Sequence, residues 1–234
     1  MKKRLKINGI IMGFAALAIA IFPRFFLRVA NSDSMQKEIL EALGFALILL
    51  GQIIRVSARG YKSEHSLDSR VLIQGGPYQV IRNPMYLGIF LIGLGVVLAV
   101  FRWWAILVFI VVFIMRYILL IFKEEKKLCA IFPQAYLEYC RKVPRILPAL
   151  SSIIRLDVSE YLPIRIAWFK KEIGSILTLL LLTLLVGSWE DIAKEGVKVY
   201  LQQSVWIFLI FVLFILFIIL LSKRTDKRDE SNAS

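Results

Sequence analysis

The chain has 234 residues, of which 59% are hydrophobic and 20% charged, and its mean hydropathy is +0.72. Soluble domains are about 45–50% apolar, so the composition excludes a disordered chain and argues against an ordinary cytosolic globule. The net charge of +13 is typical, in so apolar a chain, of loops held at an anionic membrane face, and we expect no nucleic-acid partner.

Apolar stretches long enough to cross a bilayer recur along the chain. A span needs roughly 20 apolar residues, or fewer where flanking side chains snorkel to the interface. About six spans are predicted, at Ile7–Phe22, Ile39–Val56, Pro84–Phe101, Trp103–Phe122, Ile173–Trp189 and Ser204–Leu221. The fold class is therefore all-α, a polytopic transmembrane helical bundle.

Lysine and arginine residues alternate along this series of spans. Most of them lie before the first span, between the second and third, between the fourth and fifth, and after the last. Because cytoplasmic loops carry the positive excess, both termini are predicted to be cytoplasmic in a multi-pass protein of the cytoplasmic membrane or an equivalent one. The start of the chain also fits a cleavable signal peptide, but its removal would break this alternation.

The third and fourth spans are separated only by Arg102, which predicts a tight helical hairpin. Its cytoplasmic ends adjoin two long loops, and these loops must meet in space. We divide the chain into an N-terminal two-helix region at 1–68, a core at 69–150, and a region at 151–234 with an interfacial helix, two further spans and a polar tail. The interfacial helix is the apolar and basic stretch around Trp168, with a simple linker as the alternative.

The first candidate cluster runs from Gly75 to Gly88 and precedes and opens the third span. Asn83 is a good helix N-cap and Pro84 suits the first helical position. The free N–H groups of such a helix end attract an anion such as a carboxylate, and Arg82 adds a fixed positive charge beside them. Taken alone, the same residues also fit a simple helix cap with a cytoplasmic arginine.

The second cluster, Lys123 to Lys127, stands where the fourth span leaves the membrane. Acidic residues at a helix C-terminus are disfavoured by the macrodipole, so Glu124 and Glu125 need a cation, which neighbouring lysines can supply. Arg116 lies inside the span, where a charge is functional by default unless its side chain snorkels. A third cluster, Phe132 to Arg145, predicts a short amphipathic helix ended by Val143-Pro144.

The histidine and the two cysteines, which could in principle bind a metal or react, are predicted to form no site. The only histidine, His65, stands in a polar loop and is predicted to be a surface residue. Cys129 and Cys140 have neither a CxxC pairing nor metal-ligand spacing, so neither a metal nor a disulfide scaffold is expected.

The three clusters carry a resemblance through their order and spacing. The pattern GPYxxxRNPMYxG, then a hairpin, then EExxLxxxFxxxYxxYxxxVPR, is similar to the isoprenylcysteine carboxyl methyltransferase and phospholipid methyltransferase superfamily. The likeness covers roughly Ser69–Pro148. It implies an integral membrane methyltransferase that uses S-adenosylmethionine in a pocket on the cytoplasmic side, with a lipid or lipidated small molecule as methyl acceptor and membrane lipids around it.

The resemblance also implies which residues contact the cofactor. Carried over by position, they are Arg70, Val71, Leu72, Ile73, Tyr78, Asn83, Pro84, Met85, Tyr86 and Glu124. From its charge, Arg82 joins them as a partner for the cofactor carboxylate. Glu124 suits the ammonium or the ribose hydroxyls, and the two tyrosine rings suit a sulfonium or adenine. The candidate catalytic residues are Arg116 and Glu125, the latter or a tyrosine being a possible base for an amine acceptor.

Two positions depart from the family pattern. The family usually has histidine where this chain has Asn83, and asparagine cannot exchange a proton near neutral pH. The prenylcysteine branch carries an arginine at the position of Leu120, where Arg116 could substitute only from the turn before. The alternatives are an NADPH-dependent reductase of the sterol reductase type and a non-catalytic membrane scaffold. The last two spans have no assigned role beyond shielding a lipid entrance or forming a homo-oligomer.

Overall fold

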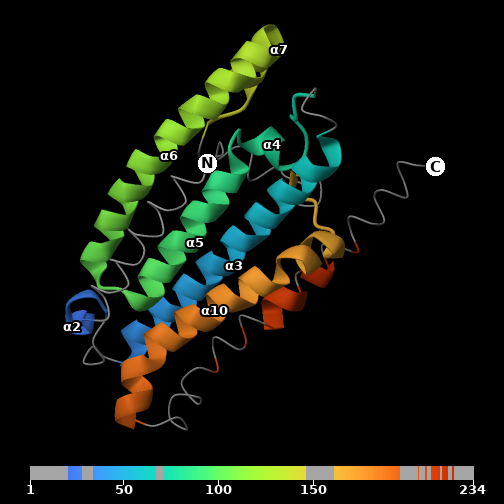
Figure 1. Ribbon diagram of the computed structural model, residues 1–234. Helices are drawn as coiled ribbons and strands as arrows, with labels where there is room; N and C mark the ends of the chain where they lie inside the picture. Colours follow the sequence, from blue (N-terminus) through green and yellow to red (C-terminus); the bar gives the residue numbers. More distant parts are fainter. Residues whose placement is uncertain are drawn as a thin grey trace.

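The computed structural model describes residues 21–27, 34–66, 71–145, 161–195 and a few positions between 205 and 223 (Figure 1). These residues form helices, and within them the only β-type pairing is an isolated bridge between Leu27 and Phe101, so the all-α prediction is confirmed. The helices are α2 (Pro23–Phe26), α3 (Ser34–His65), α4 (Pro77–Val80), α5 (Pro84–Val100), α6 (Trp103–Ile131), α7 (Pro133–Lys142) and α10 (Ile166–Glu195).

Four long helices, α3, α5, α6 and α10, lie side by side and alternate in direction (Figure 1). Two of them, α3 from Met35 and α6, are long and apolar enough to cross a membrane, and α5 is a shorter apolar helix. Helix α3 contains the predicted second span, α5 corresponds to the third, α6 contains the fourth and α10 contains the fifth. Nearly all of the first predicted span and part of the last lie outside the described residues, so six spans stay a prediction.

The predicted hairpin is confirmed at Arg102. Helix α5 ends at Val100 and α6 begins at Trp103, so the turn is as tight as the sequence predicts. The backbone N–H of Arg102 donates to the carbonyl oxygen of Phe26 at 3.1 Å, and Phe25 and Phe26 pack against Trp104. The segment before α3 therefore supports the turn at this end of the bundle.

Glycines let α3 and α5 approach backbone to backbone. Gly51 faces Gly88, and Gly44 faces Gly95, so two pairs recur seven residues apart on both helices. A Cβ on Gly51 would lie 2.6 Å from the carbonyl oxygen of Gly88, and one on Gly88 would lie 2.7 Å from the carbonyl oxygen of Gly51. Small residues at such intervals are the usual device for close helix contact in membranes. This contact holds the start of α5 against the second half of α3.

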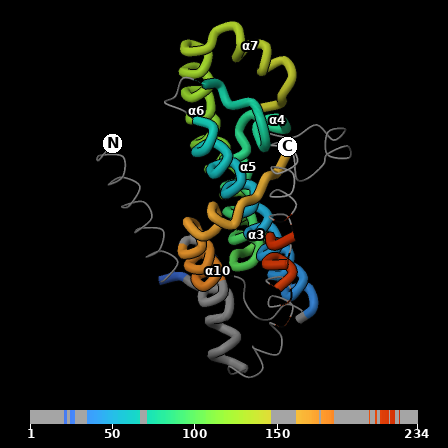
Figure 2. The backbone as a smooth tube through the Cα atoms, turned by 90° about the vertical axis from the view of Figure 1, so that its right-hand side faces the viewer, coloured from blue at the N-terminus to red at the C-terminus, as the bar shows by residue number. Residues whose placement is uncertain are grey.

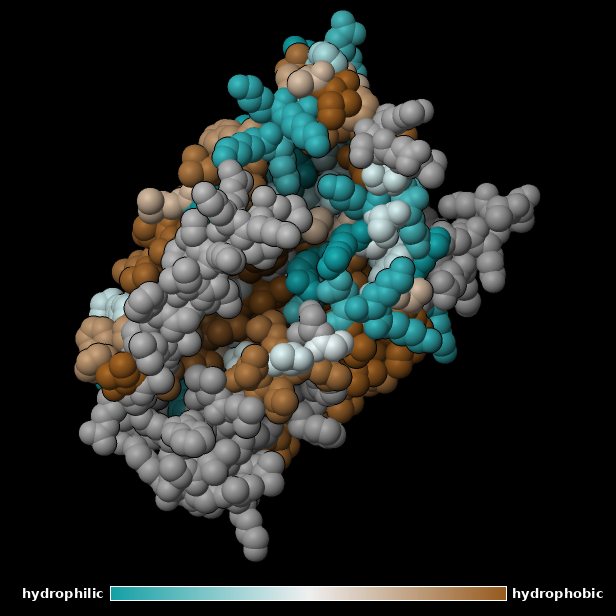
Figure 3. Space-filling view, viewed as in Figure 1, coloured by the Kyte–Doolittle hydropathy of each residue, from teal (hydrophilic) through white to brown (hydrophobic). Residues whose placement is uncertain are grey.

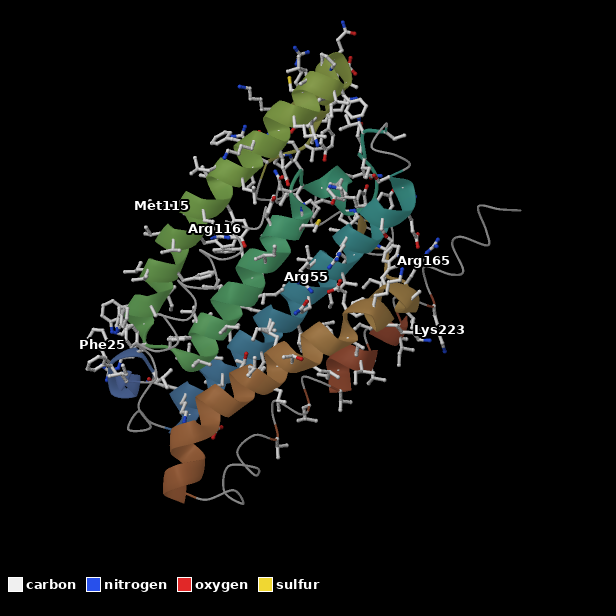
Figure 4. The ribbon with its side chains drawn as sticks, in the orientation of Figure 1. Phe25, Arg55, Met115, Arg116, Arg165 and Lys223 are labelled. Atoms are coloured by element: carbon white, nitrogen blue, oxygen red, sulfur yellow. The ribbon has the colours of Figure 1, made fainter. Side chains whose placement is uncertain are left out.

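Helix α10 is joined to α3 by charged side chains. The carboxylate of Glu172 accepts from Arg55 at 2.7 Å and from Arg59 at 2.5 Å. Figure 4 shows Arg55 on α3, on the side that faces α10. Nearer the helix ends, Glu64 accepts from the indole N–H of Trp168 at 2.7 Å and pairs with Arg165 at 3.1 Å. These contacts hold α10 against α3.

Replacing Glu172 by glutamine is expected to lower the free energy of unfolding by about 1–3 kcal/mol, because the partly buried guanidinium group of Arg55 loses the carboxylate that it binds, while exposed Arg59 contributes little. The matched control is Lys171→Gln, since Lys171 is exposed on the same helix turn. The thermal unfolding midpoint in detergent measures both. Equal midpoints for the two variants would show that the ion pairs contribute nothing to the packing of α10 on α3.

The stretch around Trp168, predicted to be an interfacial helix, packs two aromatic side chains into the core of the bundle. Trp168 and Phe169 are 6% and 5% exposed and belong to the main core, together with Ile48, Ile53 and Ile176. The Trp168 ring lies so close to Gly60 that no side chain would fit there. The two aromatic side chains are therefore buried against α3, where Gly60 leaves room for the indole, while Ile166 at the start of α10 stays exposed.

One end of the bundle gathers the polar side chains. The end of α3, α4, the start of α5, the end of α6 and the whole of α7 lie together there, as Figures 1 and 2 both show. In Figure 3 hydrophilic residues cover much of this end, while the visible surface along α6 is mostly hydrophobic. The two loops that adjoin the hairpin therefore meet, as the sequence predicts, and they bring the candidate residues to one place.

Candidate functional site

The turn before α5 is built around glycines and a tyrosine. Gly76 adopts φ 56°, a backbone conformation that favours glycine, and Tyr61 of α3 lies against both Gly75 and Gly76 with no room for a side chain on either. The hydroxyl of Tyr78 in α4 donates to the carbonyl oxygen of Ala58 at 3.4 Å. The end of α3 thus holds the loop that leads into α5.

Asn83 is the N-cap residue of α5, and Pro84 stands at the first helical position, as predicted. The carbonyl oxygen of Asn83 accepts from the N–H groups of Tyr86 and Leu87. Its side chain, however, makes no capping hydrogen bond. Instead the amide Nδ2 donates to the carbonyl oxygen of Arg145 at 3.1 Å, because the chain after α7 passes close by. The side chain of Asn83 is thereby used to tie two segments together.

Glu124 and Glu125 point to different surroundings because successive residues on a helix are turned by about 100°. Glu124 is exposed, and its carboxylate interacts with the hydroxyl of Tyr86. The negative charge of Glu124 also acts on Tyr78, which places Tyr78 in the electrostatic neighbourhood of this carboxylate. Glu124, Tyr78 and Tyr86 form what we call the tyrosine–carboxylate cluster.

Glu125 is buried and faces two guanidinium groups. Arg82 lies 3.2 Å from Oε1, and Arg145 binds both oxygens at 3.0 and 2.9 Å. The side chain of Arg82 is only 12% exposed, and its Nη1 also lies 2.9 Å from the Sγ of Cys140. Arg82 was expected to receive a cofactor carboxylate, and in this structure it already pairs with Glu125, a carboxylate that it shares with Arg145. We call Arg82, Glu125 and Arg145 the carboxylate clasp.

The tyrosines at this end are not set up to act as bases. Burial, together with the negative charge of Glu124, raises the pKa of Tyr78 well above its ordinary value. Burial likewise raises the pKa of Tyr139, whose hydroxyl donates to the carbonyl oxygen of Tyr78 at 2.6 Å. Both phenols therefore stay protonated near neutral pH and serve as hydrogen-bond donors.

An aromatic column runs between α5 and α6 toward the cluster. Phe90 packs on Phe109 and Phe113, Phe113 stacks on Tyr117 with ring centroids 4.1 Å apart, and Tyr117 meets Tyr86 at 5.4 Å. The column is apolar in the middle of the bundle and ends in phenol hydroxyls beside a carboxylate. The rings fill the contact between α5 and α6 on the side of the bundle that leads to the cluster.

The remaining predicted contacts have mixed positions. Val71 is exposed, Ile73 is half-buried, and Leu72 packs with Tyr136 and Tyr139. Pro84 is buried at the start of α5 and Met85 is half-buried beside it. Arg70 lies outside the described residues.

Arg116 is on α6, eight residues before Glu124, so the two α-carbons are separated by about 12 Å along the helix axis. Its side chain is exposed and extends to the α5 side of the helix, opposite to Met115 (Figure 4). Its position along α6 is at the level of the aromatic column, below the clasp.

Two residues of the site, Tyr139 and Arg145, were given no role by the sequence analysis. Arg145 and Tyr139 both belong to the third cluster, and their contacts reach Glu125 and the backbone of Tyr78. The Val-Pro that ends α7 was the available signal, because it stops the helix and lets the chain turn back. His65 is exposed and stacks on Tyr61, as expected for a surface residue, and no metal-binding group of side chains occurs in the part of the chain that the structure describes.

A family model of phospholipid methyltransferases matches residues 39–135. The match begins in α3, includes α4, α5 and α6, and ends within α7. Searches of curated proteins and of solved structures gave no significant match. The family and the two long apolar helices together indicate a membrane methyltransferase. The resemblance seen in the motifs is thus confirmed over residues 39–135, which are similar to the phospholipid methyltransferase family.

Proposed function

We propose that the protein is an integral membrane methyltransferase that transfers a methyl group from S-adenosylmethionine to a lipid or lipidated acceptor. The observation that carries this proposal is the meeting of Glu124 of α6 with Tyr78 and Tyr86 at the start of α5, inside the region that matches the family. When bound, the cofactor supplies a sulfonium methyl group, which passes to a nucleophilic oxygen or nitrogen and leaves a neutral thioether.

The residues of the tyrosine–carboxylate cluster fit this cofactor. An exposed carboxylate suits an ammonium group or ribose hydroxyls, and the faces of two phenol rings suit a sulfonium or an adenine. The N-terminal end of α5 beside them suits a carboxylate. Because the Arg82 guanidinium is mostly buried and already contacts Glu125 and Cys140, we assign recognition of the cofactor carboxylate to the start of α5 rather than to Arg82.

The acceptor is proposed to approach along the aromatic column. Its apolar chain would lie between α5 and α6, where Phe90 and Phe113 offer ring surfaces, and its reacting end would stand near Tyr117 and Tyr86. Arg116 on the same side of α6 is the proposed partner for a negative group of the acceptor. A carboxylate acceptor is already charged and needs no base, which agrees with phenols that stay protonated.

In the membrane, we propose a multi-pass arrangement with the polar end of the bundle in the cytoplasm. The lysines and arginines that flank the predicted spans support this orientation through the positive-inside rule. Both termini would then be cytoplasmic, and the cofactor would reach the cluster from the cytosol while the acceptor enters from the lipid.

The proposal is tested with purified protein in lipid nanodiscs. S-adenosylmethionine is expected to raise the thermal unfolding midpoint, and NADPH at the same concentration is not. Lipid extract incubated with methyl-labelled cofactor is expected to yield a labelled lipid. Label released by mild base identifies a carboxylate ester, and stable label in a headgroup identifies an amine. A shift with NADPH alone would favour a reductase, and no shift with either would favour a scaffold.

A further inference from the structure

We propose that the carboxylate clasp, Arg82–Glu125–Arg145, closes the chain segment after α7 across the start of α5 and so forms one wall of the cofactor site. Glu125 is then a positioning residue rather than a base. The identity of the cofactor rests on the proposed function, whereas the clasp itself is defined by the contacts of these three side chains.

The clasp joins three segments that are distant in sequence. Glu125 belongs to α6, Arg82 to the turn before α5, and Arg145 to the chain beyond α7. Arg145 binds Glu125 through two parallel hydrogen bonds at 3.0 and 2.9 Å, and its guanidinium lies 4.9 Å from the ring of Phe122. A bidentate guanidinium–carboxylate pair fixes direction as well as distance, so it defines where the segment crosses.

Backbone contacts show that the segment is laid on the start of α5. The N–H of Arg82 donates to the carbonyl oxygen of Pro144 at 2.9 Å, and Asn83 donates from its side chain to the carbonyl oxygen of Arg145 at 3.1 Å. Val143 is buried with Tyr136 and Tyr139. The segment thus has an apolar anchor, two hydrogen bonds to the residues before α5, and one ionic connection to α6.

The position of Glu125 beside Glu124 explains why the ion pair between Glu125 and Arg145 affects the proposed cofactor site. Glu124, the next residue, faces Tyr78 and Tyr86, so any rotation of α6 that frees Glu125 also moves Glu124. Both oxygens of Glu125 already accept from guanidinium groups, so the carboxylate is not free to take a proton from an acceptor. Arg145 lies ten residues beyond the end of the family-model match, in the Val-Pro-Arg that ends the motif pattern.

The test uses the full chain in nanodiscs and compares Glu125→Gln with Glu138→Gln, a matched change at an exposed position of α7. Hydrogen exchange of the Arg82 amide reports the clasp without any cofactor, because this N–H bonds to Pro144. Glu125→Gln is expected to accelerate that exchange tenfold or more and to weaken S-adenosylmethionine binding at least fivefold. Glu138→Gln is expected to change neither. Arg145→Lys, which keeps the charge but loses the bidentate geometry, should give the same pattern more weakly.

The outcomes separate this inference from the proposed function. Unchanged exchange of the Arg82 amide in both Glu125→Gln and Arg145→Lys would overturn the clasp. Faster exchange with unchanged cofactor affinity would overturn its role as a wall of the site. If the unaltered protein binds no S-adenosylmethionine, the proposed function fails and the role of the wall fails with it, while the exchange data still decide whether the clasp exists. If Glu125→Gln does not fold, Arg145→Lys alone carries the comparison.

Discussion

Glu124→Ala is expected to weaken binding of S-adenosylmethionine tenfold or more, which corresponds to about 1.4 kcal/mol of lost binding free energy. Glu124 is the exposed carboxylate that meets Tyr78 and Tyr86, so its removal leaves a bound cation without a charged partner. Isothermal titration of the purified protein measures the dissociation constant directly.

Two further variants sharpen this measurement. Glu124→Gln keeps the shape of the side chain and loses only the charge, so a similar loss would identify an ionic contact rather than a packing effect. Glu138→Ala removes an exposed carboxylate of α7 that is not part of the tyrosine–carboxylate cluster, and is expected to leave the dissociation constant unchanged. If Glu124→Ala binds the cofactor as tightly as the unaltered protein, the tyrosine–carboxylate cluster is not the cofactor site.

Gly51→Val is expected to cause the largest loss of stability, at least about 2–3 kcal/mol in the free energy of unfolding. A Cβ at this position would lie 2.6 Å from the carbonyl oxygen of Gly88 and 2.8 Å from the backbone nitrogen of Ile92. Backbone atoms in the middle of a helix cannot move aside as a flexible side chain can, so α3 and α5 must separate. Thermal unfolding in detergent measures the effect.

Gly174→Val on α10 is the matched control for this substitution. Nothing lies within 4 Å of a Cβ built on Gly174, so the same change there alters helix propensity without a collision. The difference between the two midpoints isolates the cost of the close approach. Equal midpoints would mean that α3 and α5 do not meet at the glycine pairs, and the position of α5 relative to Tyr61 and Tyr78 would then need another explanation.

Separation of α3 from α5 is expected to affect the site as well as stability. Tyr61 and the backbone of Ala58 on α3 hold the loop that enters α5, and Gly51 lies about two turns before Ala58 on the same helix. The glycine contact therefore sets where Asn83 and Tyr86 stand relative to α6. In a Gly51→Val protein that remains folded, cofactor affinity should fall together with stability, although the introduced side chain would touch no residue of the cluster.

Two pairs of neighbouring residues, Asn83-Pro84 and Glu124-Glu125, show which features of the site can be predicted from local sequence. Asn83-Pro84 predicted the start of α5 correctly. Proline restricts the backbone of the residue before it and has a fixed φ of its own, and both constraints act locally. The side chain of Asn83, by contrast, was expected to cap the helix and instead bonds to Arg145. No local rule could show this, because the partner lies 62 residues later and arrives there only through the turn after α7.

The amino-acid sequence by itself determined the helices, the tight turn at Arg102 and the end of the bundle at which the motifs gather. These follow from the lengths of apolar stretches, the positions of proline and glycine, and the placement of charge, all of which act along the chain. The tertiary structure alone decided which carboxylate meets which cation: Glu125 pairs with Arg82 and Arg145, while Glu124 turns to the tyrosines. Adjacent acidic residues are equivalent in a sequence motif, and only the rotation of α6 against its neighbours makes one buried and the other open.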